Sequence, residues 1–334
     1  MKIAVSLIPI LLFLAMFLSL DSFRLIRWGI LFVCLLWGGV AASLSLVGNT
    51  LITNLFHIDF DILSRYIAPL TEEILKMLLL LWLITKHRIG FAIDAAIYGF
   101  TIGTGFAFAE NMIYIFQLGP DQTNLWIWVT RGFGTAIMHG GVTAIVGIIL
   151  VNRLTDTRKL LQPFILAVIV AYLLHALYNA FFIFPLISAL IMMVLIPVTL
   201  IIVFRLSTGN LKRWLDMGID SEVELLLMIN KGKFSKTPAG KYLLSVKDHF
   251  PREVVVDMYC YSALYLELSV KAKCLLLLKE SDLPLPMDPQ IMEKLEELDM
   301  LKKNIGKAGI LALKPILRTS RSDLWALTTL KPNK

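Results

Sequence analysis

Apolar residues fall into seven runs, each close to the roughly 20 residues that a helix needs to cross a membrane. The runs lie at 3–20, 28–47, 67–85, 91–116, 127–151, 163–184 and 186–204. After residue 205 the pattern changes, because charged residues enter the apolar stretches at helical spacing. We therefore predict an all-α polytopic membrane protein with about seven transmembrane helices over residues 1–205, followed by a helical domain over 206–334.

Helix start and stop signals support the second domain. Ser221 is a predicted N-cap, with Glu224 three residues later and Gly232 after the last periodic residue. Farther on, Asp288 is a predicted cap and Gly306 a predicted stop. No catalytic motif occurs in this part of the chain, so we expect a regulatory or packing domain.

The placement of basic residues predicts the orientation in the membrane. The loops that carry no Lys or Arg are "GNTLITNLFHIDFD" and "QLGPDQTN". Basic residues mark the alternate loops: Arg24, Arg27, Lys86, Arg88, Arg153, Arg158, Lys159, Arg205, Lys212 and Arg213. By the positive-inside rule the N-terminus lies outside and the C-terminus in the cytoplasm.

Composition agrees with a membrane protein and excludes some partners. The chain is 57% hydrophobic with a net charge of +7, and its mean hydropathy of +0.74 is far above that of soluble domains. Residues 206–334 hold 20 basic and 16 acidic residues, interleaved along the sequence. An interleaved pattern is not a nucleic-acid arm, so we expect membrane lipid and membrane proteins as partners and no nucleic acid.

Several ionisable residues lie inside the apolar runs, where a charge costs roughly 2.5–3.5 kcal/mol on insertion scales. They are Glu72, Glu73, Lys76, Asp94, Glu110, Arg131, His139 and His175. Asp94 and Arg131 lie near the ends of their runs and are interpreted as interfacial anchors. At ~1.5 Å per residue, the others on four helices lie about 8–18 Å from the predicted outer ends. Their shared depth predicts one polar site in the outer half of the membrane.

The local spacing groups these residues further. Lys76 follows Glu73 by three residues and Glu72 by four, so its amine can balance part of the paired negative charge. Two adjacent carboxyls in a low dielectric do not both ionise easily, which suits a general acid and base. His175 and Asn179 share a helical face in "HALYN".

These motifs resemble those of the PrsW family of intramembrane proteases. The resemblance rests on Glu72-Glu73-x-x-Lys76, Phe106-x-x-x-Glu110 and His175-x-x-x-Asn179, with His139 on the intervening helix, and covers about residues 60–185. The family is related to the CAAX prenyl proteases and bacteriocin-processing enzymes. The resemblance implies cleavage of a single-span membrane protein near the extracytoplasmic face, of the kind known for anti-sigma factors cut at the first site of a cascade.

Two hydrolytic mechanisms fit the candidate site of Glu72, Glu73, Glu110, His139, His175 and Asn179, with Lys76 balancing charge. In the first, which we expect, no cofactor is needed: Glu72 or Glu73 is the general base, and a histidine with Asn179 stabilises the oxyanion. In the second, His139, His175 and Glu110 bind zinc and leave its fourth position open.

Two other functions remain as alternatives. Intramembrane Glu and His residues also line ion-coupled transporters, although the two halves of this chain show no inverted repeat. A catalytically silent relative that binds membrane proteins would carry the same motifs.

Overall fold

The structure is a computed structural model, and it confirms the all-α class. It describes residues 2–19, 26–118, 124–154, 161–180, 184–281, 283–284, 288–317 and 320–330. Within these ranges the regular elements are all helices. Arg24, Arg158 and Lys159, which the charge pattern uses, lie outside the described residues. The chain divides into two compact units, Met1–Thr208 and Gly209–Lys334.

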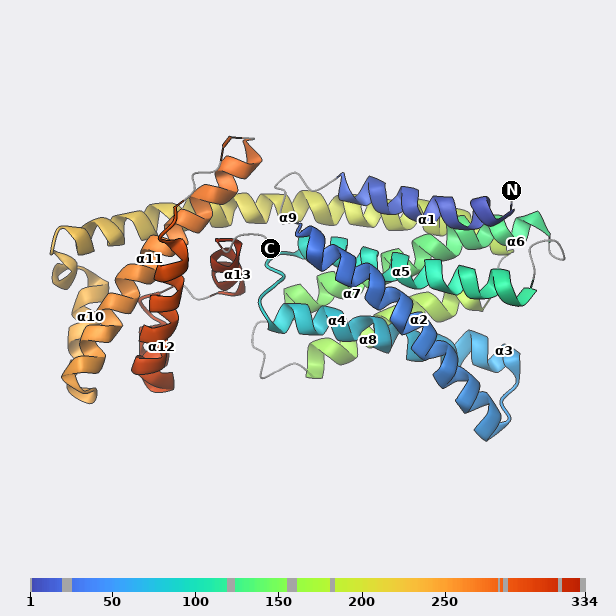
Figure 1. Ribbon diagram of the computed structural model, residues 1–334, viewed down its shortest axis with the longest axis horizontal. Helices are drawn as coiled ribbons and strands as arrows, with labels where there is room; N and C mark the ends of the chain where they lie inside the picture. The colour runs from blue at the N-terminus through green and yellow to red at the C-terminus, as the bar shows by residue number, and fades with distance from the viewer. Residues whose placement is uncertain are drawn as a thin grey trace. The chain divides into compact units, whose positions relative to one another are not determined.

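Unit 1 is a bundle of long apolar helices that lie side by side (Figure 1). Its elements are α1 (Lys2–Leu18), α2 (Trp28–Phe56), α3 (Phe60–Ile62), the π-helix η1 (Leu63–Ile67), α4 (Ala68–Thr85), α5 (Ala92–Leu118), α6 (Leu125–Val129), the π-helix η3 (Thr130–Thr135), α7 (Ala136–Arg153), α8 (Leu161–Asn179) and the first part of α9 (Pro185–Asn230).

Most of each of the seven predicted spans is helical, and the sixth, predicted at 163–184, is helical as far as Asn179. By length and composition, five helical segments of the described chain can cross a membrane: α2, α5, Leu125–Arg153, α8 and α9. Helix α4 has 18 residues but carries Glu72, Glu73 and Lys76, and α1 has 17 residues. The chain is thus a polytopic membrane protein, and the number of seven spans stays a prediction.

Helix α2 is longer than its predicted span, which ends at residue 47. The apolar residues Leu51 and Leu55 continue the helix to Phe56, and it ends where His57 adopts a left-handed conformation with φ of 51°. Part of the predicted loop at 48–61 is therefore helical, because its residues keep an apolar face.

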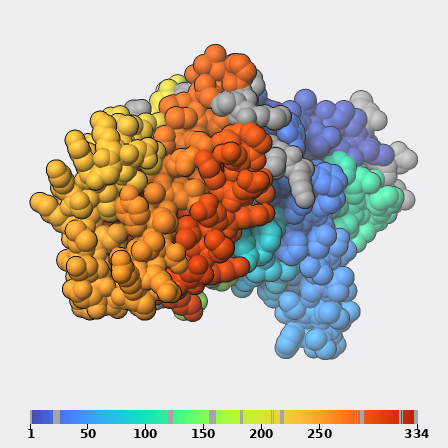
Figure 2. All heavy atoms as spheres, turned by 60° about the vertical axis from the view of Figure 1, so that its left-hand side comes forward, coloured from blue at the N-terminus to red at the C-terminus, as the bar shows by residue number. Residues whose placement is uncertain are grey.

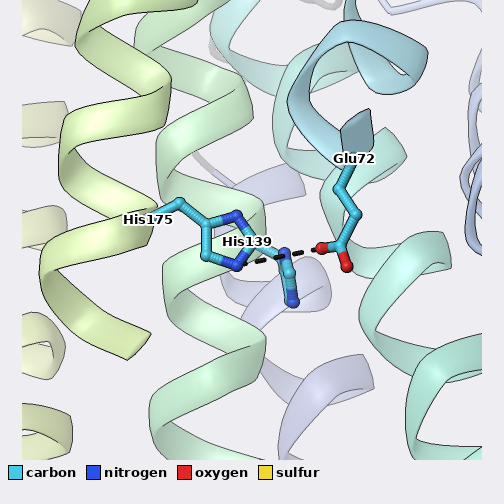
Figure 3. Close-up of side chains that lie close together, drawn as sticks. All are labelled: Glu72, His139 and His175. Carbon is cyan, nitrogen blue, oxygen red and sulfur yellow. Dashed lines mark ion pairs between the residues drawn. The ribbon is translucent and has the colours of Figure 1, made fainter. Parts of the chain in front are cut away.

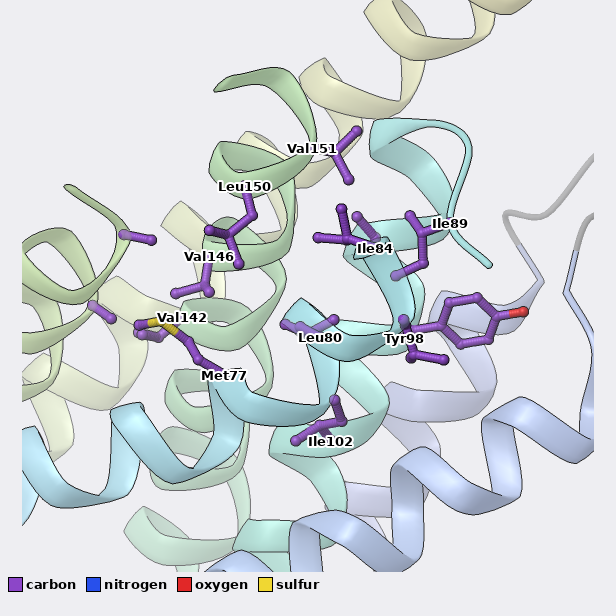
Figure 4. Close-up of a cluster of buried hydrophobic side chains, with 14 of the residues drawn as sticks. Met77, Leu80, Ile84, Ile89, Tyr98, Ile102, Val142, Val146, Leu150 and Val151 are labelled. Atoms are coloured by element: carbon purple, nitrogen blue, oxygen red, sulfur yellow. The ribbon is translucent and has the colours of Figure 1, made fainter. Parts of the chain in front are cut away.

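Helix α5 is a central helix of unit 1. Of its most apolar 18-residue window 83% is buried, and 89% of that of Leu125–Arg153, against 33% for α2 and for α8. Glycines allow its neighbours to approach closely. A Cβ at Gly103 would lie 2.2 Å from the carbonyl oxygen of His139 on α7, and one at Gly38 on α2 would lie 2.1 Å from that of Ile102. Beside these contacts lies an apolar core from α4, α5 and α7 that includes Met77, Leu80, Ile84, Tyr98, Ile102, Val142, Val146 and Leu150 (Figure 4).

Unit 2 is also helical. It contains the end of α9, α10 (Pro238–Val246), α11 (Arg252–Glu280), α12 (Ile291–Leu313) and α13 (Arg321–Thr329), and Figure 2 shows α11 and α12 against each other. A fully buried Lys273 forms an ion pair with Glu222 at 2.6 Å. The predicted cap at Ser221 is wrong, because α9 runs through it to Asn230. Gly306, with φ of 69°, kinks α12, and the helical hydrogen bonds resume beyond it.

Candidate active site

Helix α4 carries the two carboxylates and the amine of the site. It begins directly after the π-helix η1, with Pro69 in its first turn. Glu73 and Lys76 are both fully buried, and Lys76 Nζ lies 2.6 Å from Glu73 Oε1. Three residues apart, they share a face of the helix, as the spacing predicts.

Glu73 also holds the histidine of α8. His175 Nδ1 lies 2.8 Å from Glu73 Oε1, and its Nε2 lies 3.8 Å from Glu72 Oε2. Because a carboxylate only accepts hydrogen bonds, the proton of the His175 ring resides on Nδ1 and Nε2 faces Glu72 with its lone pair. The second oxygen of Glu73, Oε2, is buried without a hydrogen-bond partner among the described residues.

The histidine of α7 has the opposite tautomer. Lys76 Nζ lies 3.1 Å from His139 Nδ1, and an ammonium group can only donate. The ring proton of His139 is therefore on Nε2, which donates to Glu110 Oε2 on α5 at 3.1 Å. The centre of the Phe106 ring lies 4.7 Å from Lys76 Nζ, and the ring packs on that of His139. These contacts account for the place of Phe106 in the motif.

The structure thus brings together Glu72, Glu73, Lys76, Glu110, His139 and His175 from α4, α5, α7 and α8. Asn179 lies at the edge of this cluster, where its Nδ2 donates to the backbone oxygen of Ser64 in η1 at 3.1 Å. Asn179 thereby ties the end of α8 to the segment that precedes the carboxylates.

Arg131 is a site residue that the sequence analysis missed by interpreting it as an interfacial anchor. Its Nη2 lies 3.1 Å from Glu110 Oε2, and the arginine side chain is only 16% exposed. A count of the charges within the apolar runs could have identified it, because three buried carboxylates need more positive charge than Lys76 provides.

The charges of the cluster leave one carboxylate without a cation. Lys76 balances Glu73, and Arg131 balances Glu110. Among the described residues, no Lys or Arg lies within ion-pair distance of Glu72, whose side chain is 12% exposed and faces His175 Nε2. Glu72 is therefore the carboxylate of the three that is free to exchange a proton.

The cluster opens into a cavity of about 550 Å³. Of the cluster, Glu110, His139 and His175 line it. Most of the remaining wall is aromatic or aliphatic, with a few polar groups: Phe60, Ser64, Tyr114, Leu118, Asn124, Trp126, Ile127, Thr130, Arg131, Thr135, Tyr178, Asn179, Phe184, Pro185 and Leu186. A mostly apolar cavity with a few convergent polar groups is typical of a binding site.

Three residues of the cluster also fit a metal ion. Glu72, His139 and His175 each offer one ligand atom, and these atoms lie within 4.8 Å of one another. Figure 3 shows the three side chains converging from α4, α7 and α8. Glu73 behind His175 supplies the carboxylate that commonly orients a metal-binding histidine. This group differs from the predicted zinc set in its carboxylate, since Glu72 takes the place of Glu110.

Comparison with known proteins gives one family. Residues 27–204 match the PrsW-protease family, described as PrsW family intramembrane metalloprotease. This segment is more than half of the chain and contains every residue of the site cluster. No curated protein and no solved structure matches the chain.

Proposed function

Because the chain belongs to the PrsW family of intramembrane metalloproteases, we propose that this multi-pass membrane peptidase hydrolyses a peptide bond of a single-span membrane protein near the extracytoplasmic face. The observation that carries the proposal is the position of Glu72. It is a carboxylate without a cation partner among the described residues, next to a histidine that lines a cavity large enough for a peptide segment. Family membership favours this function over the ion-coupled transporter.

In the proposed reaction, Glu72 is the general base and Glu73 is not. Glu73 Oε1 is occupied by Lys76 and His175, so a proton taken up on either oxygen of Glu73 would remove the charge that holds two short contacts. Glu72 has no such contact to lose. It takes a proton from the attacking water as the water oxygen bonds to the scissile carbonyl carbon. The same proton then passes to the amide nitrogen as the carbon–nitrogen bond breaks.

The remaining residues position these groups. Glu73 fixes the His175 ring so that Nε2 faces Glu72 and can share its proton. Asn179 donates one amide N–H to the backbone oxygen of Ser64, and its second N–H can donate to the developing oxyanion. The apolar cavity walls exclude water and bind the side chains of an unwound substrate segment.

A divalent ion fits the same residues. Glu72, His139 and His175 would hold it, the two histidines as neutral imidazoles, and Glu72 would then serve as a ligand in place of its role as general base. When bound, the ion would make a bound water more acidic and polarise the scissile carbonyl. Zinc is the ion we propose, because a carboxylate and two imidazoles form a common catalytic zinc set.

The substrate we propose is anti-sigma-factor-like, cut at a first site outside the cytoplasm. The support is the resemblance of the motifs together with the outer-half depth that the charge pattern predicts for them. We further propose that the N-terminus lies outside and that residues 206–334 lie in the cytoplasm, where the helical unit has no part in the chemistry.

The experiment compares Glu72→Gln and Glu73→Gln in purified, reconstituted protein with a single-span substrate. Both variants keep the shape of the side chain and remove its negative charge. We expect Glu72→Gln to fold like wild type and to lose cleavage by at least about 10²-fold, the lower range for a general base. Glu73→Gln is expected to lose stability as well, because Lys76 then lacks its carboxylate. Normal turnover in Glu72→Gln refutes the proposal.

A further inference from the structure

The contacts of Arg131 go beyond an ion pair with Glu110. Arg131 Nε donates to Asn111 Oδ1 at 3.0 Å, and Asn111 Nδ2 donates to the backbone oxygen of Ser6 on α1 at 3.1 Å. The guanidinium lies 3.6 Å from the centre of the Tyr114 ring. The arginine is thus held at three points, by a carboxylate, an amide and an aromatic face.

The backbone around Arg131 has an irregular helical turn that helps to place its side chain. It lies in the π-helix η3, whose wider turn holds an extra residue and rotates the flanking residues by about 100°. Gly132 lets this turn lie against α1, because a Cβ there would be 2.1 Å from the carbonyl oxygen of Val5. π-turns of this kind are frequent at functional sites.

Arg131 and His139 meet at one atom. Both lie 3.1 Å from Glu110 Oε2. The arginine therefore determines where that oxygen lies when it accepts the Nε2–H of His139. Since Lys76 holds the other nitrogen of the same ring, a continuous polar chain runs from Glu73 through Lys76, His139 and Glu110 to Arg131.

We propose that Arg131 is a positioning residue of the peptidase, which acts on the reaction through Glu110 and the orientation of His139. The proposal rests on the proposed function, because it assigns His139 to the reacting site. Arg131 also lines the cavity, so the rival role is direct contact with the substrate. The two roles differ in which kinetic constant they change.

The experiment measures kcat and KM for Arg131→Gln, Arg131→Lys, Glu110→Gln and the double variant Glu110→Gln/Arg131→Gln. We expect Arg131→Gln to lower kcat about 10- to 100-fold, as is common for residues that orient a site residue, with KM unchanged. Arg131→Lys keeps the charge but cannot contact Glu110 and Asn111 as a planar fork, so its kcat should lie between those of Arg131→Gln and wild type. The double variant should be no slower than Glu110→Gln.

Arg65 provides the matched control. It lies in η1, partly exposed, and pairs with Asp61 at 3.6 Å, so Arg65→Gln should leave both constants at their wild-type values. A rise in KM alone on Arg131→Gln, or losses that multiply in the double variant, overturns the positioning role. If Arg131→Gln does not fold, Arg131→Lys with and without Glu110→Gln gives the same test. The proposed function is tested separately: it holds if the wild-type chain cleaves the substrate and Glu72→Gln does not, whatever the outcome for Arg131.

Discussion

A methyl group added to helix α5 should damage the site without changing any polar side chain. In Gly103→Ala, the new Cβ would lie 2.2 Å from the carbonyl oxygen of His139 and 2.6 Å from the Cα of Gly140. Contacts of this kind need at least 3.0 Å. The backbone of α7 at His139 must therefore move by about 0.8 Å away from α5.

Two effects follow from this displacement. Overpacking a tight helix contact costs about 1–3 kcal/mol, against a gain of about 1 kcal/mol from replacing glycine within a helix. The net loss of stability should therefore be at most about 2 kcal/mol. The catalytic effect should be larger, because moving a reacting group by about 1 Å can cost on the order of 10²-fold in rate. We expect a folded protein with cleavage reduced by roughly that factor.

Two other glycines separate this effect from general damage. Gly99→Ala places a Cβ 2.5 Å from the carbonyl oxygen of Thr143, one turn of α7 away from His139, and Gly48→Ala meets nothing within 4 Å. Thermal unfolding in detergent and substrate cleavage would be measured for all three variants. Gly99→Ala should lose stability but keep most of its activity, and Gly48→Ala should keep both. Equal inactivation of Gly99→Ala and Gly103→Ala, or full activity of Gly103→Ala, would refute the reasoning.

Two further outcomes are expected. Reporter fusions within 119–123 should report outside, and fusions within 155–160 or at the C-terminus should report cytoplasm, by the positive-inside rule; a cytoplasmic signal at 119–123 would contradict an outer-face site. Elemental analysis should find about one divalent ion per wild-type chain, retained in Glu110→Gln and lost in His175→Ala, with activity lost on chelation and restored by zinc. Full activity of a metal-free chain would contradict the metal site.

The sequence predicts the helices of this fold well, because apolar runs of spanning length admit few other structures in a membrane. It also predicts that the polar residues meet, since Glu72, Glu110, His139 and His175 share a depth on four helices. Depth is set by sequence position alone, at a fixed rise per residue. These side chains can converge in unit 1 because their positions in the sequence place them at similar depths.

The contacts within the cluster follow from how the helices are rotated and packed, which the sequence does not reveal. A π-turn before α7 changes the face on which Arg131 lies, and apolar periodicity gives no sign of it. The position of His139 likewise depends on the close contact of α5 and α7 at Gly103. At Ser221 the local cap signal, worth only about 1 kcal/mol, does not start a new helix, and α9 continues through this position.

Hydrolysis in water enriched in ¹⁸O tests the central claim most directly. Purified chain and a reconstituted single-span substrate would be incubated in this water, and the products analysed by mass spectrometry. We predict two fragments cut near one end of the substrate's transmembrane segment, with one ¹⁸O atom in the new C-terminal carboxyl group, and neither fragment with Glu72→Gln. Intact substrate with the wild-type chain, or the same labelled fragments with Glu72→Gln, would contradict the account.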